Sequence, residues 1–211
     1  MAVSIDELVV ADPPAAWEAL GFAVEGGVCV IGGVRIRLAG AEAGKGLVGW
    51  SLRGLADAEL DGLPTSRSER PAPAAARPHP NGVAGLDHVV ALTPALERTV
   101  SALEAAGLDL RRVRAEPTPA GAPRQAFFRL GAEILEVVQE PAVVVERDGA
   151  DRAAFFWGLA LLSTDLDATV AALGERVGEA REAVQPGRRI ATLRRSAGLS
   201  VPVALMTPRP R

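Results

Sequence analysis

The chain has 211 residues, of which 48% are hydrophobic and 23% charged, and its formal net charge is −3. This is the composition of a globular protein with enough chain to bury a sizeable core. A slightly acidic surface does not attract nucleic acid or anionic membranes, so we expect neither as a partner.

Cysteine content and the N-terminal stretch both favour a reducing compartment. Cys29 is the only cysteine, which excludes internal disulfides and multi-cysteine metal sites. The first residues carry acids where a signal peptide needs bases, and no apolar run approaches about 18 residues. We therefore expect a cytoplasmic protein.

Residues 1–55 have the pattern of a degenerate β-α-β-β-β module. A short helix is expected from Pro13, capped by Asp12 and ending at Gly21. Glycine-rich turns separate the predicted strands, which are 8–11, 22–31, 34–38 and 47–52.

Residues 56–85 are rich in proline, alanine, arginine and serine. Proline lacks a backbone donor and restricts its neighbours, so this composition disfavours both helix and sheet. We predict a linker without regular structure.

Residues 86–141 show a second β-α-β-β-β pattern. Alternation in the first strand puts His88 on one face with Val90. Thr93, followed by proline, is the expected cap of an apolar-striped helix that ends at Gly107. The remaining predicted strands are 110–114, 125–130 and 133–138.

The last two of these strands are predicted to form a hairpin in which Phe127 lies opposite Glu136. One face of the hairpin is then wholly apolar, and the helix should cover it. The other face is mixed, which is typical of either a solvated surface or a ligand cavity. It carries Gln125, Phe127, Arg129, Ile134, Glu136 and Val138.

Residues 153–208 repeat the same plan. Leu96, Thr99 and Val100 match Leu166, Thr169 and Val170 at an offset of 70 positions. The first strand is expected at 155–163, with a helix capped by Thr164 and three more strands near 183–185, 189–194 and 199–206. The predicted fold class is therefore α+β, with paired βαβββ modules and an additional N-terminal module.

Residues 85–90 (GLDHVV), 124–131 (RQAFFRLG) and 134–138 (ILEVV), in this order around a capped helix, resemble the glyoxalase and bleomycin-resistance group, the vicinal-oxygen-chelate superfamily. The resemblance covers roughly 84–208. It implies a glyoxalase-like domain with a cavity enclosed by paired modules. In active members a divalent metal is held by first-strand and last-strand side chains.

Carried over by position, His88 matches the first-strand ligand and Glu136 the last-strand ligand. The corresponding positions of the third module fall on Gly158 and Val203, whose side chains cannot bind a metal. His79 and Glu7 are conceivable substitutes. The implied metal set, His88 and Glu136, is thus incomplete, and no cofactor is assured.

Two functions remain open. The preferred one is binding of a small, largely apolar organic molecule, with polar contacts from His88, Gln125, Arg129 and Glu136 and packing on Phe127. The alternative is a metal-dependent lyase, isomerase or dioxygenase in which Glu136 moves a proton. Without the resemblance, His88 is more simply a strand histidine bonded to a carbonyl, and Glu136 could be satisfied by a plain ion pair.

Two further features carry weaker expectations. Arg188, after a turn, could bind an anionic ligand, although a solvated hairpin corner is the simpler interpretation. The additional N-terminal module could pack on its own chain or mediate a homodimer.

Overall fold

The computed structural model describes residues 2–74, 77–117 and 121–209. The chain divides into two compact units, each built from three separate segments. Unit 1 is Met1–Asp6, Gly49–Arg70 and His88–Trp157, and unit 2 is Glu7–Val48, Pro71–Asp87 and Gly158–Arg211. Four strands contribute residues to both units: β1 (Ser4–Val10), β5 (Leu47–Arg53), β7 (Val83–Thr93) and β11 (Phe155–Ser163).

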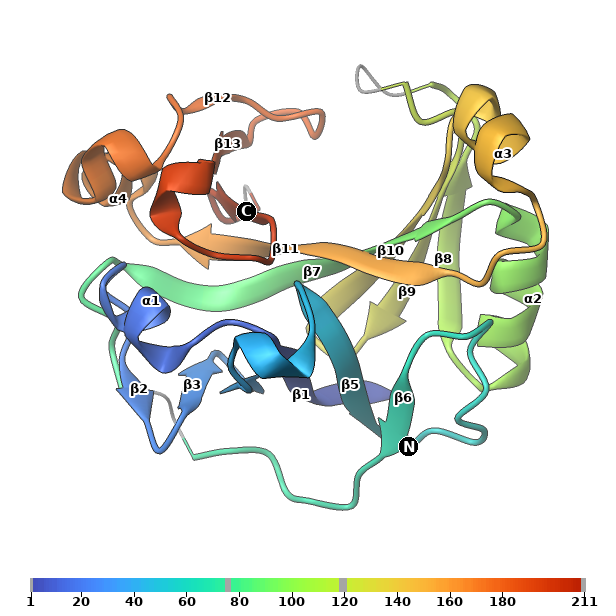
Figure 1. The fold of residues 1–211 in the computed structure, drawn as a ribbon, viewed down its shortest axis with the longest axis horizontal. Coiled ribbons are helices and arrows are strands. Elements are labelled where there is room, and N and C mark those ends of the chain that lie inside the picture. Colours follow the sequence, from blue (N-terminus) through green and yellow to red (C-terminus); the bar gives the residue numbers. More distant parts are fainter. Residues whose placement is uncertain (1, 75–76, 118–120, 210–211) are drawn as a thin grey trace. The chain divides into compact units, whose positions relative to one another are not determined.

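Unit 1 contains a sheet with the strand order β7-β10-β9-β8. Its other elements are α2 (Leu96–Ala105), α3 (Ala142–Asp148), β6 (Thr65–Arg67), β8 (Asp109–Arg114), β9 (Gln125–Leu130) and β10 (Glu133–Gln139). Helix α2 packs against β8, β9 and β10, as Figure 1 shows. The side chains between the helix and the sheet are fully buried, namely Phe128, Leu130, Leu135 and Val137.

Unit 2 contains two such arrangements, with the strand orders β2-β3-β4-β1 and β12-β13-β14-β11. The first strand of each lies beside its last strand and runs parallel to it. The elements are α1 (Pro14–Glu18), α4 (Leu166–Leu173), β2 (Val24–Glu25), β3 (Val28–Ile31), β4 (Val34–Leu38), β12 (Arg181–Glu182), β13 (Arg189–Thr192) and β14 (Val203–Met206). Short 3-10 turns lie at 41–43, 174–176 and 195–197.

The βαβββ plan therefore occurs three times in the described part of the chain, starting at β1, β7 and β11. In the strand order of the larger sheet β11 stands next to β7. This is the α+β fold of repeated βαβββ modules that the sequence predicted. The domain boundaries at 1–55, 56–85, 86–141 and 153–208 remain predictions.

The repeat at an offset of 70 is visible as a repeated hydrogen bond. The hydroxyl of Thr93, at the end of β7, lies 2.7 Å from that of Thr99 in α2. In the third module Ser163 Oγ lies 2.8 Å from Thr169 Oγ1. Because both pairs tie the end of a first strand to the first turn of the helix that follows, the two modules share a local geometry as well as a pattern.

Several element boundaries differ from those predicted. Helix α2 begins at Leu96, two residues later than expected, and Thr93 Oγ1 accepts a hydrogen bond from Ala95 N just before it. Helix α4 is capped by Asp165, whose carboxylate accepts from Ala168 N, rather than by Thr164. Both predicted N-caps were therefore wrong: the N-cap residue is Ala95 rather than Thr93, and Asp165 rather than Thr164.

In the first module the residues expected to form one strand, 22–31, form a hairpin instead. Gly26 and Gly27 adopt left-handed φ values of 57° and 77°, which turn the chain between β2 and β3. As a result β4 is the last strand of that module, and β5 is an additional strand. Asp12 does not cap α1 either, since its carboxylate accepts from Trp17 Nε1 and Ser200 N.

The segment predicted to be an irregular linker contains β6, which pairs in parallel with β5 through Trp50 and Thr65. It also contains the start of β7. A short edge strand tolerates proline-rich neighbours because only one of its sides needs hydrogen-bond partners. Residues 75–76 of this segment lie outside the described part of the chain.

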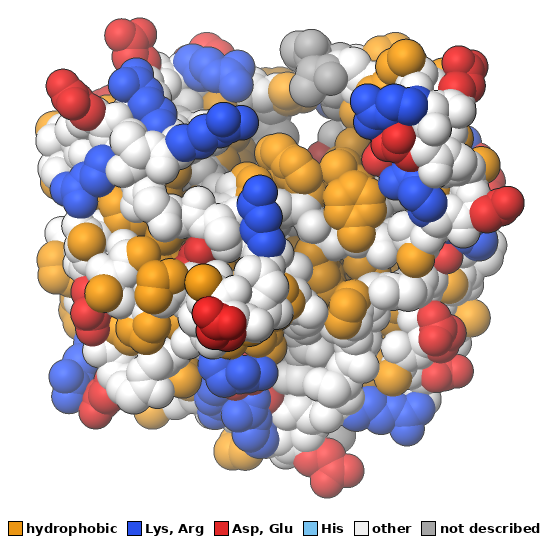
Figure 2. Space-filling view, viewed as in Figure 1, with side chains coloured by type: hydrophobic (Ala, Val, Ile, Leu, Met, Phe, Trp, Pro, Cys, Tyr) orange, Lys and Arg blue, Asp and Glu red, His pale blue; other side chains and the backbone are white. Residues whose placement is uncertain are grey.

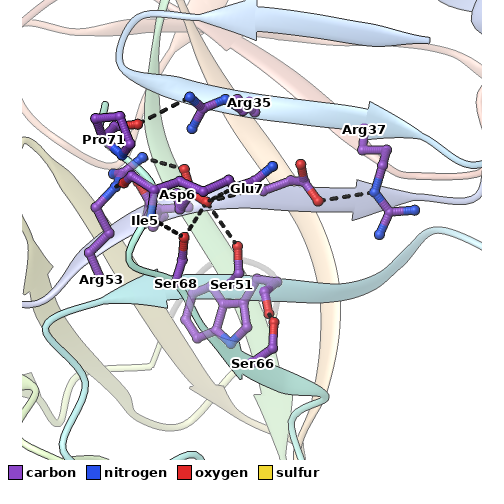
Figure 3. A network of polar contacts seen from close by, with 12 residues as sticks. Ile5, Asp6, Glu7, Arg35, Arg37, Ser51, Arg53, Ser66, Ser68 and Pro71 are labelled. Carbon is purple, nitrogen blue, oxygen red and sulfur yellow. Dashed lines mark hydrogen bonds and ion pairs between the residues drawn. The ribbon is translucent and has the colours of Figure 1, made fainter. Parts of the chain in front are cut away.

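A buried carboxylate in unit 1 holds β1, β5 and the residues after β6 together (Figure 3). Asp6 is fully buried and forms ion pairs with Arg53 and Arg70, and it accepts hydrogen bonds from Ser51 and Ser68. Burial raises the pKa of Asp6, but the hydrogen bonds from Ser68 and Arg70 and the two positive charges outweigh burial, so its pKa lies below the ordinary value.

In Figure 2, acidic and basic side chains are interspersed over the visible face, without an extended area of one sign. Among the described helices none has both the length and the apolar composition needed to cross a bilayer. The absence of a nucleic-acid partner, the cytoplasmic location and the homodimer remain predictions.

Candidate functional site

The five side chains proposed from the sequence lie on one face of the unit 1 sheet. In the β9–β10 hairpin Phe127 pairs with Glu136, which confirms the predicted register. His88 aligns in parallel with a β10 residue two positions before Glu136, so it faces the same side. Alternation places Gln125 and Arg129 there as well. This face, which points away from α2, is called the open face below.

Three of these side chains meet in a polar cluster. His88 Nε2 lies 3.3 Å from Glu136 Oε2, and the exposed fractions of the two side chains are 12% and 14%. Gln125 Nε2 donates a hydrogen bond to Glu136 Oε1. The histidine and the glutamine thus each contact one oxygen of a largely buried carboxylate.

Phe127 and Arg129 lie at the more exposed part of the open face. Phe127 is half-buried, and Arg129 is exposed. The guanidinium carbon of Arg112 lies 6.0 Å from the centre of the Phe127 ring, within the range of a cation–π contact. Arg112 pairs with Phe127 across β8 and β9.

Arg112 also belongs to this face, although the sequence did not predict it there. A register shift between Leu110 and Arg112 changes which residues of β8 face the site. Such a bulge leaves no pattern in the sequence of a single strand, so alternation alone could not have placed this arginine.

The pair formed by His88 and Glu136 occupies a position that recurs in the first module. There the strand partner of Glu7 lies two residues before Arg37, just as the partner of His88 lies two residues before Glu136. Arg37 Nε lies 3.0 Å from Glu7 Oε1. A residue of a module's first strand therefore lies beside the last-strand residue two positions beyond its strand partner, and we call these two positions the diagonal. In the first and second modules the two side chains on the diagonal form an ion pair or a close polar contact.

In the third module the same diagonal carries no polar side chain. Leu159 pairs with Val203, so Gly158 aligns with the residue before Val203, and the position equivalent to Glu136 is Ala204. The sequence had placed it at Val203. The equivalent position therefore lies one residue later than predicted, because the loops of the two modules differ in length. The side chain of alanine cannot bind a metal either.

Gly158 is required by the backbone. A Cβ atom at this position would lie 2.7 Å from Pro202 O, closer than real Cβ atoms approach a neighbour. Pro202 O is held in place because it accepts a hydrogen bond of 2.9 Å from Leu159 N. No histidine fits at this position without a shift of β11 or β14.

The side chains present do not fit a divalent metal site. His88 and Glu136 supply two donors, whereas such cations take at least four and often six ligands. Both carboxylate oxygens of Glu136 already have partners, and the described residues contain no group of three or more His, Cys, Asp or Glu that could hold an ion.

The two conceivable substitutes are engaged elsewhere. His79 is buried, accepts a hydrogen bond from Ala23 N at Nδ1, and has Nε2 3.0 Å from Val30 O. Burial lowers the pKa of His79, and the contact with Val30 only partly offsets this. Glu7 pairs with Arg37.

Arg188 does not lie at a solvated corner but is buried in an ion pair with Asp87. It is 2% exposed and contacts both carboxylate oxygens of Asp87, at 2.9 and 3.2 Å. It also donates to Gln185 Oε1 and Thr207 O. These partners within unit 2 take up most of its N–H donors, which leaves little of the guanidinium for an anionic ligand.

No family model and no curated protein matches the chain. Similar solved structures include methylmalonyl-CoA epimerase from Mycobacterium tuberculosis, with 21% identity, a TM-score of 0.49, and coverage of 61% of this chain and 91% of that one. A hypothetical protein from Bacillus halodurans has 15% identity, a TM-score of 0.47 and coverage of 60% and 95%. A single-residue variant of methylmalonyl-CoA epimerase from Streptomyces coelicolor, in complex with 2-nitronate-propionyl-CoA, has 24% identity, a TM-score of 0.46 and coverage of 59% and 97%.

Proposed function

We propose that this protein binds a small, largely apolar organic molecule on the open face of the unit 1 sheet. The observation that carries the proposal is the cluster of His88, Gln125 and Glu136, three largely buried polar side chains in contact on a face whose other members are mainly apolar. A few convergent polar groups in apolar surroundings are typical of ligand sites.

The neighbours of the cluster suit this role. Val90 is 8% exposed, and Ile134 and Val138 are half-buried on the same face. These side chains, with the ring of Phe127, provide contact area for an apolar body. Arg129 and Arg112 lie toward the exposed edge, where they can pair with an acidic group of a ligand.

Glu136 is the group through which a reaction could proceed. It lies within hydrogen-bonding reach of an imidazole, so a proton can pass between these two side chains and a bound molecule. A metal-dependent lyase, isomerase or dioxygenase would need further ligands, which this face does not supply. We therefore favour binding without a metal.

Native mass spectrometry of the purified chain tests the proposal. We expect a small-molecule adduct that is lost on denaturation, absent from Phe127→Ala and His88→Ala, and retained by the control Val143→Ala, an exposed residue of α3. An adduct retained by both site variants would argue against binding on the open face.

A metal titration tests the alternative function. Addition of zinc, nickel, manganese or iron should leave the melting temperature unchanged, because two donors bind these ions weakly. A rise in melting temperature that disappears in His88→Ala would support the metal-dependent enzyme instead.

A further inference from the structure

Gln125 holds a strong acceptor on the open face that the described residues leave without a partner. Its side chain is largely buried, with 7% of the residue exposed, and within the described residues Oε1 has no hydrogen-bond partner. The orientation of the amide is fixed by its neighbour, because carboxylate oxygens only accept hydrogen bonds. Nε2 must therefore face Glu136, and Oε1 must face away from it.

A buried hydrogen-bond acceptor without a partner is unusual. Most buried polar atoms in folded proteins have a partner, since desolvation without a hydrogen bond is costly. A partner for Gln125 Oε1 has to come from outside the described residues, as a water molecule or as a group of a bound molecule, and because this oxygen has almost no accessible surface, such a partner reaches it only when the side chains that cover it move. The partner has to be a donor.

We infer that the ligand carries a hydroxyl or N–H group that donates to Gln125 Oε1, and that its apolar body packs on Phe127. The inference rests on the proposed function and adds the chemical class of the ligand. Ketones, esters and ethers, which only accept, would leave Oε1 unpaired and should bind less well.

The spacing of the two residues fits such a molecule. Gln125 and Phe127 are two residues apart on β9 and face the same side, so their Cα atoms are about 6.6 Å apart. One substituted aromatic ring covers this distance, with its substituent at Gln125 and its face or edge on Phe127. Arg112, whose guanidinium carbon lies 6.0 Å from the centre of the Phe127 ring, is left for a second substituent.

Two probes of similar shape test the inference. Phenol and anisole share the ring, but only phenol donates a hydrogen bond. Dissociation constants are measured for both by amide chemical-shift titration of the full chain labelled with nitrogen-15, which also locates binding. We expect phenol to bind about tenfold more tightly than anisole, with shifts in β9 and β10 and in the side-chain amide of Gln125.

Two variants control for the identity of the acceptor. Gln125→Met keeps the size of the side chain and removes the acceptor, so it should bind both probes equally. Gln139→Met removes a second amide whose Oε1 is also buried without a partner among the described residues, but Gln139 lies on the opposite face of β10 by alternation. It should keep the preference for phenol.

The possible results distinguish a failure of the hydrogen-bond-donor inference from a failure of the proposed ligand binding. If anisole binds the open face as tightly as phenol in the unaltered chain, the donor inference is wrong and ligand binding stands; a water molecule then occupies Oε1. If neither probe shifts resonances of this face, both are wrong. The comparison in the unaltered chain decides the matter even if Gln125→Met does not fold.

Discussion

Gly158→Ala tests whether the third module lacks its first-strand ligand for a backbone reason. The new Cβ would lie 2.7 Å from Pro202 O. Non-bonded heavy atoms attract only at about 3.5 Å and beyond, so β11 and β14 would have to separate. Pro202 O is hydrogen-bonded to Leu159 N, which resists that movement.

The expected cost follows from two opposing effects. Overpacking of this kind destabilises by about 1–3 kcal/mol, while replacing glycine with alanine gains about 0.4–1 kcal/mol through the unfolded chain. We therefore expect a net loss of about 1–2 kcal/mol in the free energy of unfolding. Equilibrium urea unfolding, followed by the fluorescence of the three tryptophans, measures it.

Gly33→Ala is the matched control. Gly33 lies between β3 and β4, its φ is outside the left-handed region, and a Cβ there would meet nothing within 4 Å. This variant should be as stable as the unaltered chain or slightly more stable. If Gly158→Ala proves as stable as Gly33→Ala, the strands can yield, and the steric explanation for the missing ligand is wrong.

Two further predictions concern buried groups. Asp6→Asn should lower the free energy of unfolding at pH 7 by about 3 kcal/mol, because Arg53 and Arg70 lose their buried counter-charge. Since the pKa of Asp6 is lowered in the folded state, its contribution is complete above the unfolded pKa of about 3.9 and is lost as pH falls through the folded pKa. The gap between the two proteins should therefore narrow below pH ~4; a constant gap, or an equal loss in the exposed control Asp167→Asn, would contradict this. Burial raises the pKa of Cys29 to about 12, so its thiol should react with a disulfide reagent at pH ~8 only after unfolding, and rapid labelling of the folded chain would show that Cys29 is accessible.

Much of the candidate site could be predicted from alternation along single strands. Side chains in a strand alternate between two faces, so the apolar positions of β9 and β10 identified the face covered by α2. The positions left over were Gln125, Phe127, Arg129 and Glu136, and the pairing of Phe127 with Glu136 follows from a two-residue turn. Only Gly131 of that turn takes a left-handed φ, so Ala132 is not strained there.

The contacts within the site were decided by the tertiary structure. Whether Glu136 meets His88, Gln125 or Arg129 depends on side-chain direction and on the stagger of β7 against β10. Neither can be deduced from the pattern of apolar and polar residues in a single strand. The state of the Gln125 oxygen, which finds no partner in the described part of the chain, is likewise a property of everything packed around it.

The amino-acid sequence by itself determined the repeated β-α-β-β-β plan and the buried side of β9 and β10, because both depend on residues close together in the chain. The tertiary structure decided what depends on strands far apart. It paired Arg188 with Asp87, 101 positions away, brought the carbonyl oxygen of Pro202 to 2.7 Å from where a Cβ atom of residue 158 would lie, and left Gln125 with an acceptor that none of the described residues satisfies. These outcomes are set by distances between backbones, which a local pattern of apolar and polar residues does not encode.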